Sequence, residues 1–279
     1  MINNKNIFNK YPLTIYFILT FIISWGAIVM LVGPDGIPVD PDQAVTLGMA
    51  ILLGPSITSL LLAGLTSGKR GYRELGSRLF KWRVSFGWYA VALLTAPLST
   101  AAVLILLSFF SSEFVPSIFM SENKISLLSM GIIAGLMVGF FEELGWTGFA
   151  IPRMRLRYGV LETGLIVGLL WGLWHFLLFW EMDSFSGVLP LVLLLARLFS
   201  WLPAYRILMV WVYDRTESLF VVILMHTSLV ATLMIIDPVL SGGSLVTFIL
   251  VRAAVLWVIA GMVTATRRQK FEAIGNSQF

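Results

Sequence analysis

Hydrophobic residues run along this chain in long stretches that short polar segments separate. The pattern predicts about eight helices, near residues 12–33, 44–67, 86–110, 126–150, 160–180, 187–213, 217–237 and 244–266. Several stretches reach the roughly 20 residues that a helix needs to cross a bilayer. The first is too long for a signal-peptide core and lacks a clear cleavage site, so we interpret it as a retained span. We therefore expect an all-α fold: a polytopic membrane helix bundle forming one membrane domain over residues 1–279.

Two segments between these helices have a distinct composition. Residues 33–42 are rich in Gly, Pro and Asp, which is typical of a turn-forming loop. Residues 68–83 form a basic segment that we expect to be a loop, with a short interfacial helix whose Leu79, Phe80 and Trp82 enter the lipid.

The charges of the connecting segments alternate in sign along the chain. Basic side chains precede the first span and then follow every second span: Lys5, Lys10, Lys69, Arg70, Arg73, Arg78, Lys81, Arg83, Arg153, Arg155, Arg157, Arg215, Arg267, Arg268 and Lys270. The other connections carry mainly acids: Asp35, Asp40, Asp42, Glu113, Glu122, Glu181 and Asp183. Because cytoplasmic loops are enriched in Lys and Arg, the pattern predicts a multi-pass protein of the cell membrane with both termini in the cytoplasm.

The amino-acid composition agrees with a membrane protein and excludes several kinds of chemistry. The chain is 58% hydrophobic and 12% charged, whereas soluble domains carry about 25% charged residues. The net charge of +4 lies in short loops, so it reports topology and predicts the lipid bilayer, not nucleic acid, as the partner. The absence of cysteine excludes disulfides, thiolate metal sites and a cysteine nucleophile. The sequence sets no oligomeric state.

Ionisable residues within the expected spans are the candidates for function. They are Glu142, Glu143, His175, Arg197, Arg206, His226 and Arg252. A charge near the bilayer centre costs roughly 2.5–3.5 kcal/mol, so two adjacent glutamates need a polar cavity or neutralisation. Neighbours on a helix point about 100° apart, so one glutamate can face a reacting atom while the other supports it. Solvation of both at the cytoplasmic surface is the alternative.

The histidines and arginines each have a structural interpretation. His175 and His226 could simply hydrogen-bond within or between helices. Arg197 could pair with a carboxylate or bind a substrate carboxylate, Arg206 could extend to the cytoplasmic surface, and Arg252 could do so or bind carbonyl groups. However, the chain has two histidines, and both fall within spans. Two imidazoles and a carboxylate can hold a divalent metal such as zinc or activate water directly.

The chain lacks the residues that other mechanisms of proteolysis within a membrane require. The chain has no cysteine, no lysine within a span, no aspartate deep in a span and no H-E-x-x-H motif. Glutamate and histidine remain.

Three separated motifs resemble one known family. They are "EELGWTG" with Glu142 and Glu143, "WGLWH" with His175, and "HTSLV" with His226. They resemble the CAAX protease and bacteriocin-processing family of intramembrane proteases, of the Ras-converting endopeptidase type. The flanking "GFAIPRM" and "VYDRTESL" are also similar to its bacterial members. The resemblance runs from Phe140 to Ala231, within a motif-bearing core of about residues 126–237.

The resemblance implies an intramembrane endopeptidase that cleaves a membrane-associated or prenylated peptide. It implies that Glu142 and His175 activate the attacking water, that His226 helps to bind the oxyanion and that Glu143 supports them. If a metal such as zinc is used, Glu142, His175 and His226 are its expected ligands. A metal-free, glutamate-activated water is equally open.

Two positions depart from the family's motifs. Thr147 stands in place of an arginine that would pair with Glu143, unless Arg197 or Arg206 supplies that charge. Val230 stands in place of an asparagine.

The asparagine would add a donor one turn after His226, and Thr227 or Ser228 could replace it. An oxyanion donor is worth about 10²–10³ in rate. The alternative function is therefore a non-catalytic bacteriocin-immunity or membrane scaffold protein of the same fold. A small transporter with Glu142 as proton carrier is a third interpretation.

Overall fold

The computed structural model describes residues 4–33 and 43–275 and contains helices and no strand within them. The α-helices are α1 (Asn4–Lys10), α2 (Pro12–Val32), α3 (Ala44–Ile51), α4 (Leu53–Leu79), α5 (Phe86–Ser108), α6 (Ser117–Met120), α7 (Lys124–Gly145), α8 (Ile151–Met154), α9 (Val160–Trp174), α10 (Phe176–Phe179), α11 (Val188–Leu195), α12 (Leu202–Thr216), α13 (Leu219–Ile235) and α14 (Gly242–Gly275). Two π-helical turns, η3 (Trp146–Ala150) and η4 (Ala196–Ser200), join α7 to α8 and α11 to α12.

Six helical segments are long and apolar enough to cross a membrane. They are Pro12–Val32, Thr46–Leu79, Phe86–Ser108, Lys124–Met154, Val188–Thr216 and Gly242–Ala265. The apolar helices α9 and α13 are shorter, and they occupy the remaining two stretches in which the sequence predicts a helix. The prediction of an all-α, polytopic membrane bundle is confirmed.

The basic segment between the second and third spans was expected to be a loop with a short interfacial helix. A helix is present there, but it is longer than expected and occupies the segment up to Leu79, with Phe80 and Trp82 after its end. Helix α4 continues to Leu79, with a kink at Gly68, whose φ of 56° and ψ of −140° leave the helical region. Glycine adopts such a backbone conformation at little cost because it has no Cβ. The helical geometry is therefore interrupted at Gly68, and a second helical stretch of α4 begins there in a new direction. Of the Gly- and Pro-rich segment at 33–42, all but Gly33 lies outside the described residues.

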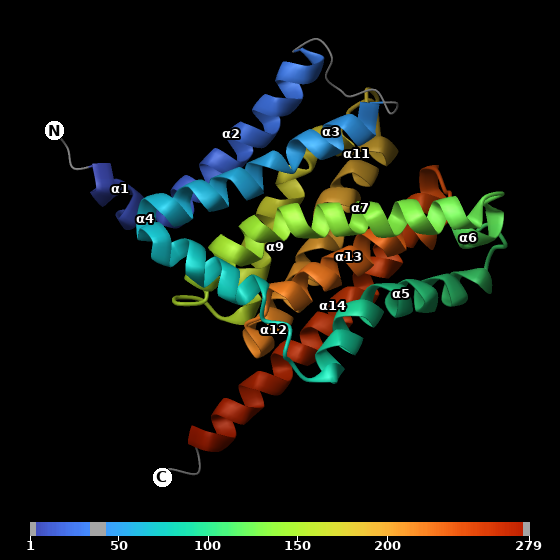
Figure 1. The fold of residues 1–279 in the computed structure, drawn as a ribbon. Coiled ribbons are helices and arrows are strands. Elements are labelled where there is room, and N and C mark those ends of the chain that lie inside the picture. The colour runs from blue at the N-terminus through green and yellow to red at the C-terminus, as the bar shows by residue number, and fades with distance from the viewer. Residues whose placement is uncertain (1–3, 34–42, 276–279) are drawn as a thin grey trace.

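Two helix pairs form the middle of the bundle. Helix α7 packs along α13, and α9 packs along α12. Helices α2 and α4 flank them on one side, and α5 and α14 flank them on the other (Figure 1). The pairs approach closely because each has a glycine at every fourth position on one face, which lets two backbones meet in lipid. These glycines are Gly131, Gly135 and Gly139 of α7, and Gly164, Gly168 and Gly172 of α9.

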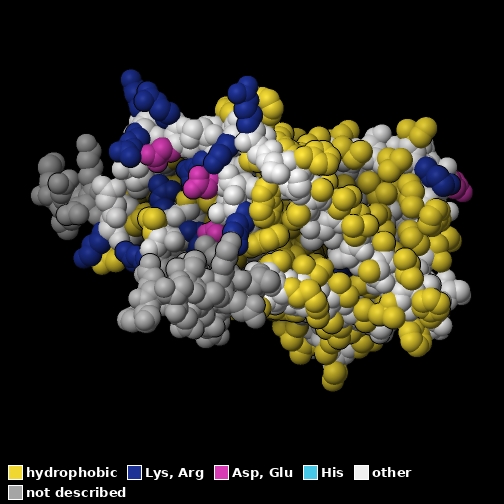
Figure 2. All heavy atoms as spheres, turned by 90° about the horizontal axis from the view of Figure 1, so that it is seen from below, with side chains coloured by type: hydrophobic (Ala, Val, Ile, Leu, Met, Phe, Trp, Pro, Cys, Tyr) yellow, Lys and Arg dark blue, Asp and Glu magenta, His cyan; other side chains and the backbone are white. Residues whose placement is uncertain are grey.

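Most of the charged side chains in view gather at one end of the molecule, a few lie at the opposite end, and the surface between them is broadly hydrophobic (Figure 2). We call the former the basic end. Its cations come from α1, the second half of α4, the α4–α5 connection, α8 and the α8–α9 connection: Lys10, Lys69, Arg70, Arg73, Arg78, Lys81, Arg83, Arg153, Arg155 and Arg157. Multi-pass membrane localisation follows from the apolar helices, whereas the orientation of the termini stays a prediction.

Candidate active site

The two adjacent glutamates lie just before a π-helical turn. Helix α7 ends at Gly145 and continues as η3, in which the backbone is wider than an α-helix. Hydroxyl groups of α4 donate to two carbonyl oxygens here: Ser56 Oγ to that of Phe141 at 2.5 Å and Ser59 Oγ to that of Leu144 at 2.7 Å. Single π-turns are frequent at functional sites. Contacts from a neighbouring helix thus fix the backbone on both sides of the glutamates.

Glu143 is fully buried, and several partners hold its carboxylate. Arg206 Nη1 of α12 donates to Oε1 and Oε2 at 2.8 and 3.0 Å. His226 Nδ1 of α13 lies 2.8 Å from Oε1, and the Thr147 hydroxyl donates to Oε2. An ionised carboxylate can only accept hydrogen bonds, so His226 carries a proton on Nδ1. Glu143 thereby neutralises a buried arginine and orients His226.

Glu142 points to a different helix and has a simpler environment. Its side chain is buried, and its Oε2 accepts a hydrogen bond of 2.6 Å from the indole Nε1 of Trp171 on α9. This direction agrees with the angle of about 100° between neighbouring residues on a helix. The environments of the two glutamates therefore differ: among the described residues, several donors surround Glu143, and one donates to Glu142.

Trp171 contacts the remaining polar groups of the site. Its ring centroid lies 5.4 Å from that of His175 and 5.4 Å from that of His226. The guanidinium of Arg206 lies 4.1 Å from the ring centroid, a cation–π distance. The indole therefore joins Glu142, both histidines and Arg206 into one cluster.

His175 is held by the turn that precedes it. Its Nδ1 lies 2.7 Å from the carbonyl oxygen of Trp171. A carbonyl can only accept, so Nδ1 donates and Nε2 is left as an acceptor in the neutral ring. The side chain is partly exposed, unlike that of His226.

Several buried donors near the glutamates have no hydrogen-bond partner among the described residues. They are Nε and Nη2 of Arg206, Nε1 of Trp146 and the hydroxyl of Tyr16. The Tyr16 and Trp146 rings are in edge contact at 5.9 Å, and Trp146 begins the π-turn after Glu143. A buried polar group without a partner costs about 1–3 kcal/mol, and native proteins usually satisfy such groups with water or ligand. These donors can bind a water molecule or a substrate oxygen.

The expected arginine roles change in the structure. Arg206 does not extend to the cytoplasmic surface: it is fully buried and replaces in space the arginine that the motif lacks at Thr147. Arg197 pairs with the Glu181 carboxylate at 2.5 Å, which is the first of the two roles expected for it. Arg252 pairs with Asp237, so the expectation of surface extension or carbonyl binding is wrong.

Sequence reasoning offered Arg206 beside Arg197 as a partner for Glu143, and it missed the role of Trp171 in joining the cluster. The signal for the arginine was Thr147 at the motif's arginine position, which called for a cation from another helix.

The candidate metal ligands Glu142, His175 and His226 do not stand together as a coordination set. No three His, Asp or Glu side chains in the described part of the chain are grouped closely enough to hold a metal ion. Each histidine has Nδ1 held by an acceptor and Nε2 left over, which by itself is compatible with metal binding. The spacing of the side chains, and not their direction, is therefore what does not fit a zinc ion.

The fold and the site together define a class: a membrane helix bundle with glutamates and histidines clustered in its interior. Residues 124–232 match the family described as type II CAAX prenyl endopeptidase, Rce1-like. The chain is 32% identical over 77 residues to CAAX prenyl protease 2 of Methanococcus maripaludis, an alignment that covers 28% of this chain and 23% of that protein. Both findings support the Rce1-type branch of the CAAX protease and bacteriocin-processing family and confirm the resemblance that the motifs indicate.

Proposed function

We propose that this protein is a CAAX-type intramembrane endopeptidase that hydrolyses a peptide bond in a membrane-associated or prenylated peptide. The family match supports this function because residues 124–232 include all three motifs. The observation that carries it is the cluster around Trp171, in which the indole contacts Glu142, His175 and His226 from three helices.

Glu142 is the proposed general base. Its carboxylate has one hydrogen-bond donor among the described residues, so it can accept a proton from water. Glu143 is unsuited to this role because Arg206, His226 and Thr147 already occupy its oxygens. In the proposed reaction the water oxygen attacks the scissile carbonyl carbon, and its proton passes to Glu142. When the C–N bond breaks, Glu142 returns this proton to the leaving amine.

The histidines and Arg206 complete the proposed site. His175 offers Nε2 as an acceptor that orients the attacking water. His226 binds the oxyanion when its ring is doubly protonated, with Glu143 accepting from Nδ1 and Nε2 donating to the substrate. The unpartnered donors of Arg206 add positive charge beside the oxyanion. This contribution replaces part of what the asparagine at the position of Val230 supplies in the family's motif.

Catalysis by glutamate-activated water without a metal is part of the proposal, since the donor set does not fit a zinc ion. We expect purified active protein to contain no stoichiometric zinc and to retain cleavage after chelation. Elemental analysis before and after chelator treatment measures both. One zinc ion per chain whose removal abolishes activity would replace this mechanism by a metal-dependent one.

A non-catalytic immunity or scaffold protein is the second candidate. One observation favours it: the network of Glu143, Arg206, His226 and Thr147 ties together α7, α12 and α13 and stabilises the fold whether or not a substrate binds. Valine at position 230, where the family's motif has an asparagine donor, also favours the non-catalytic candidate.

One assay separates the enzyme from the binder. Parent, Glu142→Gln and Glu162→Gln proteins are reconstituted in liposomes and incubated with a pool of prenylated and unmodified peptides. Glu162 is an exposed glutamate in the first turn of α9, so its variant controls for the chemical change. We expect Glu142→Gln to lose cleavage and Glu162→Gln to keep it. Equal cleavage by the parent and Glu142→Gln would remove Glu142 as the base, and no cleavage by any variant would favour the non-catalytic candidate.

We further propose that the basic end faces the cytoplasm, because Lys and Arg are enriched on that side of membrane proteins. The cysteine-free chain allows a direct test with single cysteines at Arg73 of the basic end and Glu113 at the opposite end. An impermeant thiol reagent outside intact cells should label the cysteine at 113 and not the one at 73. The reverse labelling would invert the topology.

A further inference from the structure

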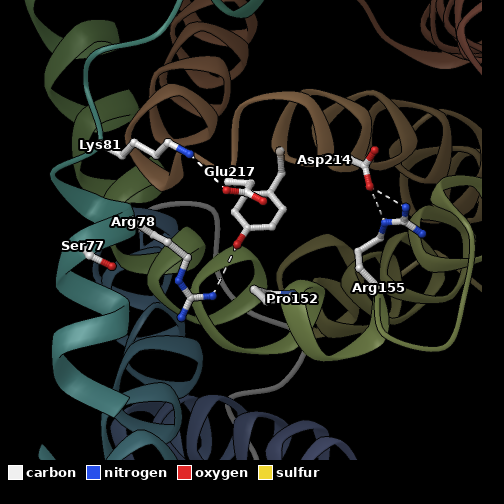
Figure 3. Close-up of a pocket in the computed structure, with 8 residues that line it drawn as sticks. Ser77, Arg78, Lys81, Pro152, Arg155, Asp214 and Glu217 are labelled. Carbon is white, nitrogen blue, oxygen red and sulfur yellow. Dashed lines mark hydrogen bonds and ion pairs between the residues drawn. The ribbon is translucent and has the colours of Figure 1, made fainter. Parts of the chain in front are cut away.

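Two pockets at the basic end are each lined by three cations, and they differ in how these charges are balanced. The first, of about 480 Å³, is lined by both cations and acids. Figure 3 shows that its own side chains pair across it: Lys81 binds Glu217 at 3.1 Å, and Arg155 binds Asp214. Arg78 donates to the Tyr213 hydroxyl at 3.4 Å. Since most of its cations are neutralised internally, this pocket has little unused charge for a ligand.

The second pocket, of about 500 Å³, lies between the start of α2 and the α8–α9 connection. Three cations line it, Lys10, Arg153 and Arg157, and no acidic residue does. None of the three forms an ion pair with another described residue. Lys10 lies over the Tyr11 ring at 5.1 Å, and Arg153 lies over the Phe149 ring at 3.6 Å. Arg153 also donates from Nη1 to the Phe149 carbonyl oxygen at 3.0 Å. Both side chains are thus held at the pocket, and neither has a described carboxylate within ion-pair distance.

The remaining wall of this pocket is apolar. Leu13, Phe17, Leu156 and Ile166 contribute hydrocarbon surface. Leu156 is 84% exposed, which a soluble surface rarely tolerates beside other apolar groups but a lipid-facing surface does. The pocket therefore combines a concentrated positive charge with an adjoining apolar wall.

We propose that this second pocket binds the phosphate of an anionic phospholipid, with Lys10, Arg153 and Arg157 around the headgroup and the acyl chains along the apolar wall. Basic pockets between membrane helices at the headgroup level suit phosphate-bearing lipids. A soluble anion would use the cations and leave the apolar wall without a partner, so the wall favours the lipid over free phosphate.

The bound lipid would touch the wall of the candidate active site. Phe17 of the pocket stacks on Trp146 at 6.2 Å. Trp146 is in edge contact with Trp174 at 5.8 Å, next to His175 in sequence. The lipid would thus hold α2 against the π-turn. The proposal does not depend on proteolysis, because binding and thermal stability measure it directly.

The test compares two double variants of the full chain in nanodiscs. Lys10→Gln/Arg157→Gln removes one lysine and one arginine from the pocket. The control, Lys69→Gln/Arg73→Gln, removes the same two residue types from the exposed face of α4 at the same end. Each protein is prepared in phosphatidylcholine with and without phosphatidylglycerol. Retained anionic lipid is measured by native mass spectrometry, and thermal unfolding is followed in parallel.

We expect the parent and the control to retain phosphatidylglycerol and to unfold at higher temperature when it is present. Each cation near an anionic surface contributes about 1 kcal/mol, so the pocket variant should retain roughly 30-fold less and lose the thermal shift. Equal losses in both variants would reduce the effect to general surface charge and overturn the proposal. Inorganic phosphate in phosphatidylcholine nanodiscs is the last arm: a thermal shift as large as that with the lipid would assign the site to free phosphate instead.

Discussion

The helices around the glutamates and the helices at the periphery bury different kinds of surface. Of the 15 residues of α12, 12 are buried, including Arg206. Helix α2 buries five of its 21 residues, and this narrow face includes Tyr16, Thr20 and Ser24. Its exposed face carries large apolar side chains such as Ile22. In α2 polar groups therefore share the inward face with Ala27 and Ile28, while large apolar side chains face outward, because lipid removes the hydrophobic reason to bury them.

The same contrast holds for ion pairs. Arg206 and Glu143 meet where neither is exposed, whereas the side chains of Lys81 and Glu217 at the basic end are 40% and 75% exposed. Removing one member of a buried pair leaves an uncompensated charge and costs about 3–5 kcal/mol. An exposed pair contributes about 0.2–1 kcal/mol. The burial of an ion pair therefore decides how much the loss of one partner lowers the free energy of unfolding.

The largest expected effect is on the buried pair. Glu143→Gln should lower the free energy of unfolding by about 3–5 kcal/mol, because Arg206 keeps its charge without a carboxylate. Glu217→Gln makes the same change in the exposed pair and should cost at most about 1 kcal/mol. Denaturant unfolding in micelles, followed by tryptophan fluorescence, measures both. Similar losses of unfolding free energy in the two variants would show that water reaches Glu143 and screens the buried pair as it screens the exposed one.

A smaller effect is expected from the hydrogen bond that positions Glu142. Trp171→Phe keeps a ring beside the histidines but removes the Nε1 donor. Hydrogen bonds to charged groups are worth about 1.5–3 kcal/mol, so kcat/KM should fall about 10- to 150-fold.

Trp174→Phe is the matched control, since its Nε1 donates to neutral Ser24 Oγ at 2.8 Å. This variant should lose stability without a comparable loss of activity. A rate loss in Trp174→Phe as large as in Trp171→Phe would mean that both indoles act through packing alone.

The space between neighbouring helices also differs between the centre and the periphery of the bundle. A Cβ at Gly135 of α7 would lie 2.5 Å from the Thr227 carbonyl oxygen, whereas a Cβ at Gly26 of α2 would meet nothing within 4 Å. Gly135→Ala should therefore cost about 1–3 kcal/mol through overpacking. Gly26→Ala should be neutral or stabilise by up to about 1 kcal/mol, because alanine favours a helix over glycine. Midpoints from thermal unfolding test the pair, and an unchanged Gly135→Ala midpoint would mean that α7 and α13 are loosely packed.

Much of this architecture could be predicted because long apolar stretches in a sequence indicate membrane helices. The helix at each expected span follows from that signal, and so does the placement of the glutamates and histidines on separate helices. A short helix in the basic segment was expected, but its length and the kink at Gly68 could not be predicted, since Gly, Lys and Arg are common both in basic loops and in helices at the membrane surface.

The partners within the site were harder to predict than its members. Glu142, Glu143, His175 and His226 are rare ionisable residues in apolar spans, so they stand out by type. Which glutamate meets which histidine depends on the rotation of α7 against α9 and α13. The sequence does not fix this rotation, because the lipid-facing and inward-facing sides of a membrane helix are both largely apolar. The pairing of Arg206 with Glu143 depends on it in the same way.

The smallest expected effect concerns Val230, one turn after His226 on α13 and only partly buried. Val230→Asn adds a donor on the His226 face, and a complete oxyanion donor is worth about 10²–10³ in rate. We expect kcat/KM to rise by no more than about tenfold, because the free donors of Arg206 already lie at the cluster. Ala231→Asn, which places the same side chain about 100° away, should leave the rate unchanged. A gain of 100-fold or more would mean that Arg206 only neutralises Glu143, and the oxyanion site would then be incomplete in the parent.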